Sequence, residues 1–251
     1  MYICTLGKQD TMNTMDIENF QAKAACPKSL VEYLCNFVTA ERYNRIVEVA
    51  SNRIRHFSIV IENLYQSHNI SAILRTAECL GIQNVHIIEN NFQYEINQQV
   101  SLGSHKWLSI KQYNDQENNT MLCLETIKKQ GYKVIATLPH KNNCLWDEVS
   151  IDEKTAFVFG TELDGLTQEA IAMADGFVKI PMYGFTESYN VSVSVALTMM
   201  NVCERLRKSE INWRLSEEDR TDLELQWLKK SIKDVDRIIE RYDADRKESW
   251  A

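Results

Sequence analysis

Short apolar runs alternate with helix-like segments between residues 57 and 208, and this alternation limits the fold more than any other feature. The apolar runs predict buried strands at 57–61, 85–88, 107–111, 133–137, 155–159 and 177–180. The segments between them predict helices at 69–80, 118–129, 167–174 and 189–208. Because strands that alternate with helices are typical of parallel sheets, we predict an α/β fold with a mainly parallel sheet over residues 57–208.

An N-terminal helical extension is predicted over residues 28–56. Ser29 and Glu32 have the spacing of a capping box, in which a hydroxyl and a carboxylate satisfy the first backbone N–H groups of a helix. Thr39 can cap a second helix that ends near Asn52. The extension therefore consists of two short helices.

A C-terminal helical extension is predicted over residues 209–251. It begins after Ser216 with three acidic residues, which suit the positive end of a helix. One apolar stripe predicts a single continuous helix and comprises Leu228, Ile232, Val235, Ile239 and Tyr242. An adjacent basic stripe comprises Lys229, Lys233, Arg237 and Arg241. Acidic residues are interleaved with it, so it indicates either a solvated, salt-bridged face or a contact surface for nucleic acid or a partner.

The cysteines and the apolar runs bear on the compartment. The seven cysteines are widely spaced and form no CxxC pair, which is typical of reduced thiols and leads us to expect a cytoplasmic protein. No apolar run is long enough to cross a bilayer. Residues 1–27 lack the pattern of a signal peptide, and we interpret them as a mobile tail in which Met15 is an alternative start to Met1.

Several common ligand-binding motifs are absent from the sequence. The turn after the strand at 57–61 contains no glycine, which disfavours the dinucleotide site of a nicotinamide oxidoreductase. There is also no Walker loop, no HExxH helix and no GxSxG turn. The five histidines show no metal-ligand spacing, so we predict no metal.

Two polar segments follow predicted strands at the edge where parallel sheets bind ligands. In the first, Asn69 is a candidate helix cap, and Arg75 is a candidate either for a structural ion pair or for catalysis. In the second, Glu162 lies in a turn that begins at Gly160 and ends at Gly165. That turn is either an ordinary strand-to-helix connection or part of a ligand site.

A third polar segment leads from a loop into the long helix at 189–208. It carries Ser188, Asn190, Ser192 and Ser194. A helix cap requires one such residue. The three polar residues beyond the one that a cap requires indicate either a functional site or serines that allow close helix packing.

Together the three segments resemble, in order and spacing, the motifs of the SpoU family of RNA ribose 2′-O-methyltransferases. The flanking helices resemble those of its TrmH branch, which methylates guanosine 18 in the D-loop of tRNA. The resemblance implies a C-terminal deep trefoil knot, S-adenosylmethionine as methyl donor, tRNA as substrate and a homodimer. It also implies a SpoU methyltransferase domain over residues 57–208.

The resemblance also implies roles for individual residues. The catalytic group would be Arg75, Asn69, Glu162, Ser188 and Asn190. The donor would be held by Thr137, Leu138, Gly160, Ile180, Met182 and Tyr189. The basic stripe would bind RNA. Arg75 is the family's proposed base; because a guanidinium keeps its proton below a pKa of about 12, the alternative is that Arg75 holds a phosphate and stabilises the developing oxyanion.

Two further interpretations remain beside this one. The first is 2′-O-methylation of ribosomal RNA by the same chemistry, although such enzymes often carry a larger N-terminal RNA-binding domain than the residues before position 57 provide. The second is a non-catalytic RNA-binding relative, which we would expect to lack Arg75, Glu162 or Asn190; all three are present.

The distribution of charge is compatible with an RNA partner. The formal net charge is −7, and residues 57–203 hold this whole excess, with 9 basic and 16 acidic groups. The two flanks together are neutral and hold 19 of the 28 basic residues. We therefore expect an acidic donor-binding domain whose flanking helices supply most contacts to phosphate groups.

Overall fold

The computed structural model describes residues 29–90, 103–138 and 144–248. Seven parallel strands form one sheet in the order β3-β2-β1-β6-β4-β7-β5. The strands are β1 (Ile54–Glu62), β2 (Ile82–Ile88), β3 (Ser109–Tyr113), β4 (Lys133–Thr137), β5 (Cys144–Leu145), β6 (Thr155–Phe159) and β7 (Gly176–Lys179). The predicted α/β fold with a parallel sheet is confirmed.

The predicted strands differ from the observed ones mainly at their ends. The strands predicted at 133–137 and 155–159 have the predicted bounds. The strand predicted at 107–111 begins two residues later, because Trp107 belongs to a 3-10 turn, η2 (Ser104–Trp107). The two-residue strand β5 was not predicted, because so short a segment has no periodicity.

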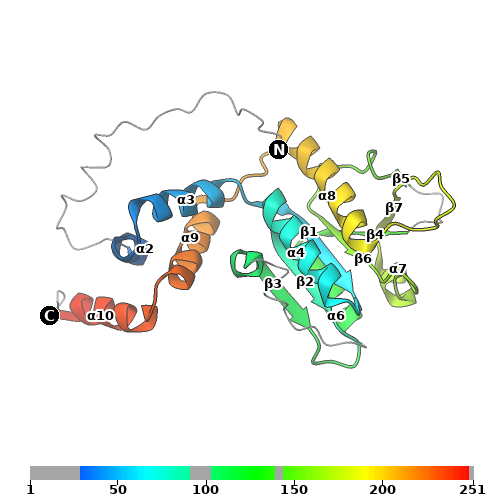
Figure 1. Ribbon diagram of the computed structural model, residues 1–251. Helices are drawn as coiled ribbons and strands as arrows, with labels where there is room; N and C mark the ends of the chain where they lie inside the picture. Colours follow the sequence, from blue (N-terminus) through cyan, green and yellow to red (C-terminus); the bar gives the residue numbers. More distant parts are fainter. Residues whose placement is uncertain (1–28, 91–102, 139–143, 249–251) are drawn as a thin grey trace.

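Helices cover both faces of the sheet (Figure 1). They are α4 (Ser67–Leu80) and α8 (Val191–Lys208) on one face, and α6 (Asn119–Lys129) and α7 (Gln168–Met173) on the other. Successive residues of β1 point to opposite faces of the sheet. Ile59 and Ile61 pack toward α4 and α8, while Val60 packs toward α6. Both faces of the central strands are therefore buried, as their continuous apolar sequences require.

The two ends of the chain form one helical extension. It comprises α2 (Leu30–Leu34), the 3-10 turn η1 (Cys35–Phe37), α3 (Ala40–Ser51), α9 (Glu217–Ser231) and α10 (Val235–Glu248). The predicted caps Ser29, Thr39 and Ser216 are confirmed. Helices α3 and α9, far apart in sequence, lie side by side (Figure 1) and share an apolar cluster that includes Ile46 and Trp227.

The prediction of one continuous C-terminal helix is wrong. Helix α9 ends at Ser231, and α10 begins at Val235 after Asp234, whose φ of 53° interrupts the helical backbone. The break redirects the chain so that Tyr242 packs against Tyr33 of α2, with ring centres 4.9 Å apart. The apolar and basic stripes of the sequence are therefore divided between two helices.

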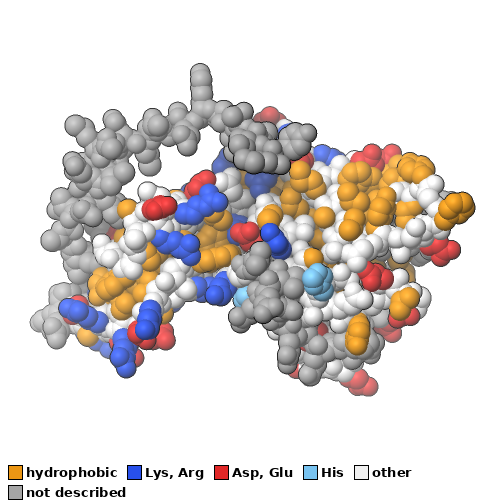
Figure 2. Space-filling view, viewed as in Figure 1, with side chains coloured by type: hydrophobic (Ala, Val, Ile, Leu, Met, Phe, Trp, Pro, Cys, Tyr) orange, Lys and Arg blue, Asp and Glu red, His pale blue; other side chains and the backbone are white. Residues whose placement is uncertain are grey.

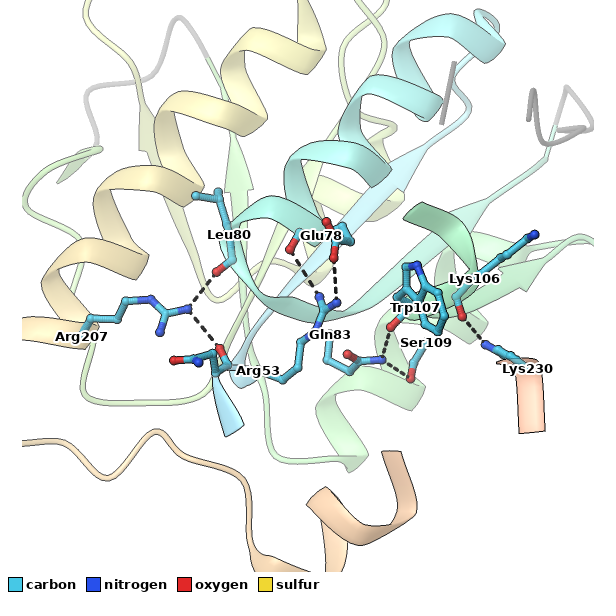
Figure 3. A network of polar contacts seen from close by, with 10 residues as sticks. Arg53, Glu78, Leu80, Gln83, Lys106, Trp107, Ser109, Arg207 and Lys230 are labelled. Atoms are coloured by element: carbon cyan, nitrogen blue, oxygen red, sulfur yellow. Dashed lines mark hydrogen bonds and ion pairs between the residues drawn. The ribbon is translucent and has the colours of Figure 1, made fainter. Parts of the chain in front are cut away.

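Buried polar contacts join the extension to the sheet domain (Figure 3). Arg53, only 1% exposed, donates to the carboxylate of Glu78 at 3.1 Å, and its guanidinium lies 5.1 Å from the ring centre of Trp227. On the other side of α4, Arg207 donates to the carbonyl of Leu80 at 3.0 Å. These contacts fix the C-terminal end of α4 between α8 and the extension.

His86 of β2 gives the fold a predictable pH dependence. Burial, and to a lesser extent the charge of Lys111, lowers the pKa of His86 to about 4. Between about pH 6.5 and pH 4, His86 binds a proton in the unfolded chain but not in the native state. The free energy of unfolding should therefore fall as the pH drops through this range. Between pH 7 and pH 5 the loss from this residue is about 2 kcal/mol.

His86→Gln should remove this part of the pH dependence. Urea unfolding at a series of pH values measures it, and the exposed His68→Gln is the matched control, which should follow the wild type. Equal pH slopes for wild type and His86→Gln would contradict the assignment.

Candidate functional site

A cavity of about 380 Å³ lies at the carboxyl ends of β4, β6 and β7. The six residues predicted to hold a donor all line it: Thr137, Leu138, Gly160, Ile180, Met182 and Tyr189. Glu162 and Ser188, predicted for catalysis, line it as well. Side chains from three loops that are distant in sequence thus surround one space at the edge where parallel sheets bind ligands.

Gly160 begins the tightest turn of this cavity. A Cβ at this position would lie 2.2 Å from the carbonyl oxygen of Gly165. Two backbone hydrogen bonds between Thr161 and Gly165, of 2.9 and 3.2 Å, close the turn. No other residue can replace Gly160 without moving this backbone, so the turn holds Glu162 at a defined place.

The carboxylate of Glu162 connects the three polar segments. Its Oε1 accepts from the side-chain amide of Asn69 at 3.3 Å and from that of Asn190. The same oxygen accepts from the backbone N–H of Val191 at 3.3 Å, at the positive end of α8. Asn190 also donates to the Oδ1 of Asn69 at 3.2 Å. The structure therefore brings together one residue from each segment.

The two helix starts at this site differ from the predictions. Asn69 does not cap α4: the helix begins at Ser67, and the Nδ2 of Asn69 donates to Gln66 at 3.1 Å. Asn190 does cap α8, since its Oδ1 accepts from the backbone N–H of Ser192 at 2.9 Å, but the helix starts two residues later than predicted. Asn190 therefore both caps α8 and belongs to the Glu162 cluster, whereas the amide of Asn69, among the described residues, forms hydrogen bonds only with the side chains of Gln66, Glu162 and Asn190.

Arg75 lies outside the cavity. It is exposed on α4 and lines a separate groove between α4 and α8, together with Trp146. Within residues 29–90, 103–138 and 144–248 it has no ion-pair partner. An ion pair therefore does not account for the presence of an arginine at this position of α4. Arg75 also does not line the cavity of its own chain.

The sequence profile of the SpoU rRNA Methylase family matches residues 56–200. The chain belongs to the SpoU methylase family. It is 39% identical over 200 residues to the tRNA (guanosine(18)-2′-O)-methyltransferase of Borreliella burgdorferi, a match that covers 80% of this chain and 90% of that protein. The enzyme of the same name from Thermus thermophilus is 32% identical over 198 residues, 76% of this chain and 98% of that protein.

Solved structures of SpoU enzymes share this fold. The A. aeolicus TrmH/SpoU tRNA modifying enzyme aligns with a TM-score of 0.69 at 28% identity, covering 77% of this chain and 98% of that one. The SpoU methyltransferase AviRb from Streptomyces viridochromogenes, solved in complex with AdoMet, aligns with a TM-score of 0.55 at 19% identity. That match covers 62% of this chain and 63% of AviRb, and it is a likeness of fold.

The predicted RNA-binding residues of this SpoU family member lie away from the cavity, in the extension. Lys229 lies in the last turn of α9, Lys233 lies in the break, and Arg237 and Arg241 lie on α10. All four are exposed. Because the break separates them, they do not form the single straight stripe that the sequence predicted.

Within the described residues, no group of histidine, cysteine and acidic side chains has the arrangement of a metal site. No helix in the described part of the chain is both long and apolar enough to span a bilayer.

Glu62, at the end of β1, is a positioning residue that the sequence did not reveal. It is 1% exposed, and its carboxylate accepts from the hydroxyl of Thr120 at 2.5 Å. It also accepts from the hydroxyl and the backbone N–H of Thr167 at 2.8 and 2.9 Å. Because Thr167 caps α7, Glu62 fixes that helix and the turn before it. A carboxylate at the end of an apolar strand is the one sequence signal that could have indicated it.

Glu62→Ala should lower the free energy of unfolding by about 2–4 kcal/mol, because it leaves buried donors of Thr120 and Thr167 without an acceptor and opens a cavity. Urea unfolding measures the loss. The matched control is Glu169→Ala, an exposed glutamate in the first turn of α7, which should change stability by less than about 0.5 kcal/mol. Similar values for the two variants would contradict the role of Glu62.

Proposed function

We propose that this chain is an S-adenosylmethionine-dependent tRNA ribose 2′-O-methyltransferase that acts on guanosine 18. The observation that carries the proposal is the cluster of Asn69, Glu162 and Asn190 at the cavity, one residue from each family segment. Two relatives that are 39% and 32% identical and cover most of the chain bear the name of this activity.

The residues that line the cavity fit the proposed donor. Its volume of about 380 Å³ lies in the range of small-molecule sites. Apolar side chains of Leu138, Ile180 and Met182 line it, as an adenine and a methionine side chain require, and Lys179 is its one cationic lining residue within the described part of the chain. When bound, S-adenosylmethionine supplies an electrophilic methyl group on a sulfonium.

The residues of the cluster then have distinct tasks. Glu162 lines the cavity and accepts from the amides of Asn69 and Asn190, so that both side chains keep one orientation beside it. Ser188, which also lines the cavity, can accept a hydrogen bond from the ribose or donate one to it. Such positioning of a hydroxyl accounts for much of the acceleration of a transfer reaction.

We propose a homodimer in which a second copy covers the groove between α4 and α8. The exposed face of α8 is apolar along positions 193, 196, 197 and 200, one side of the helix. Arg75 and Arg205 line the same groove. A second copy seated there would bring Arg75 near the partner's reacting ribose, where a guanidinium can hold a phosphate and stabilise negative charge.

Four finer features belong to the same proposal. The SpoU methyltransferase domain would comprise residues 57–208, between extensions at 28–56 and 209–251. A deep trefoil knot in the C-terminal part of that domain is supported by a strand order in which β4 lies between β6 and β7. Lys229, Lys233, Arg237 and Arg241 would contact RNA. The protein would act in the cytoplasm.

Methyl transfer from labelled S-adenosylmethionine tests the function. Label should enter a tRNA transcript and map to the 2′-oxygen of guanosine 18, and a transcript with 2′-deoxyguanosine at that position should stay unlabelled. Label that enters ribosomal RNA and no tRNA would support the ribosomal alternative. Absence of S-adenosylmethionine binding in calorimetry would support a non-catalytic RNA-binding protein.

Arg75→Lys should reduce single-turnover methyl transfer by about 100-fold or more, because lysine keeps the charge but loses the planar fork that holds a phosphate. The matched control is Arg205→Lys in the same groove, which should stay within about twofold of the wild type. Wild-type turnover of Arg75→Lys would contradict both roles considered for this residue.

Met200→Glu should convert the dimer to a monomer, because it places a charge on the apolar face of α8, where Met200 is 49% exposed. Size-exclusion chromatography with light scattering measures the mass. Met121→Glu, at a methionine of α6 that is 45% exposed, is the control and should leave the mass unchanged. A monomeric wild type, or an unchanged dimer in Met200→Glu, would contradict the proposed interface.

A further inference from the structure

Arg75 has an acidic neighbour on its own helix with which it forms no ion pair. Glu78 is the only acidic residue of α4 and follows Arg75 by three positions, a spacing at which helix side chains are neighbours. In α3, an arginine and a glutamate in the same order and spacing do pair: the guanidinium of Arg45 lies 2.7 Å from the carboxylate of Glu48. Spacing alone would therefore allow the pair in α4, so another contact must hold Glu78.

Arg53 holds the carboxylate of Glu78 (Figure 3). Its guanidinium donates to that carboxylate at 3.1 Å and to the backbone carbonyl of Glu78 at 3.4 Å. The side chain of Glu78 is 29% exposed, whereas that of Arg53 is 1% exposed. Without Arg53, the carboxylate of Glu78 would therefore have room to turn toward Arg75.

The acid on the opposite side of the groove is also paired with a cation. Among the described residues that line the groove between α4 and α8, Glu204 is the only acidic one. Lys208, one turn further along α8, lies 3.0 Å from its carboxylate. Both acids around Arg75 thus have cations of their own, which leaves the guanidinium of Arg75 available to a ligand.

Stability alone does not explain the buried Arg53. A buried ion pair is often no more stabilising than apolar residues of similar volume. In addition, the Nε of Arg53 is buried without a hydrogen-bond partner among the described residues, which is unfavourable. The effect of Arg53 on Glu78 accounts better for an arginine at this position.

We propose that Arg53 is a positioning residue for methyl transfer, which holds Glu78 so that the guanidinium of Arg75 can contact the RNA. The inference rests on the proposed function and adds to it a residue outside the cavity. A guanidinium whose planar fork is occupied by a carboxylate cannot bind a phosphate in the same way. Figure 2 shows hydrophobic side chains gathered over α8, and such surroundings strengthen the attraction of an uncompensated carboxylate for Arg75.

Arg53→Met, Glu78→Gln and the double variant test the proposal. Methionine removes the charge and can pack against Trp227, and glutamine removes the charge that would attract Arg75. Single-turnover methyl transfer to a tRNA transcript is measured, beside calorimetry of donor binding and thermal melting. If methionine prevents cooperative melting, Arg53→Gln takes its place, because glutamine keeps a donor for the carbonyl of Glu78.

The matched control is Arg207→Met, alone and combined with Glu78→Gln. Arg207 also binds the C-terminal end of α4, where it donates to the carbonyl of Leu80 at 3.0 Å (Figure 3). Among the described residues it forms no ion pair with a carboxylate. Its loss therefore disturbs the same helix end without releasing an acid beside Arg75.

Arg53→Met should slow methyl transfer about threefold to tenfold, because the released carboxylate attracts Arg75 and repels phosphate. The double variant and Glu78→Gln alone should both stay within about twofold of the wild type. Any loss in Arg207→Met should persist when Glu78→Gln is added. Donor affinity should be the same in all variants, because these residues lie outside the cavity.

NMR of protein with ¹⁵N-labelled arginine provides a readout that does not depend on catalysis. The Nε–H resonance of Arg75, assigned with Arg75→Lys, reports the partner of its guanidinium. Glu78→Gln should shift this resonance in the Arg53→Met background and leave it nearly unchanged in the wild-type background.

Equal slowing in Arg53→Met and in the double variant would overturn the proposal and assign a purely structural role to Arg53. A wild-type rate in Arg53→Met would contradict it too, as would an Arg75 resonance that ignores Glu78→Gln in both backgrounds. A wild type that transfers no methyl group would overturn the proposed function, and the Arg75 resonance would still show whether Arg53 keeps Glu78 away from Arg75.

Discussion

The parallel pairing of β1 with β6 is the contact on which the rest of the structure depends. Residues 57–61 align with residues 155–159, although almost a hundred positions separate them in the chain. Because parallel strands end at the same edge, the pairing places Glu62 beside the turn that follows β6. Glu62 then fixes Thr167, and Glu162 gathers Asn69 and Asn190. The position of the cavity is thus a consequence of one strand register.

The second organising element is the helical extension, which consists of both ends of the chain. Its apolar cluster joins α3 to α9, and the buried Arg53 connects that cluster to α4 through Glu78 and Trp227. Helix α4 therefore links the extension, at its C-terminal end, with the Glu162 cluster, at its N-terminal end. The sheet domain carries the excess negative charge, and the two flanks of the chain together are neutral.

Local sequence patterns predicted the helix caps of the extension correctly, but they did not predict the break in the C-terminal helix. The caps Ser29, Thr39 and Ser216 were predicted because capping depends on a few adjacent residues. The C-terminal helix was predicted as continuous because its apolar period persists through 232–235, yet packing of Tyr242 on Tyr33 accompanies a break there. Asn69 was wrongly predicted to cap a helix, because the same side-chain amide can either cap a helix or form a hydrogen bond with a residue distant in sequence.

By itself, the sequence determined the order of strands and helices, the parallel class of the sheet and the three segments that identify the family. These features follow from periodicity and short-range spacing, which act within a few residues. Only the tertiary structure decided that Asn69, Glu162 and Asn190 share one cluster and that Arg75 lies outside the cavity. Hydrogen-bond partners and neighbouring charges are set by strand register and helix packing, and neither is encoded in the spacing of residues along the chain.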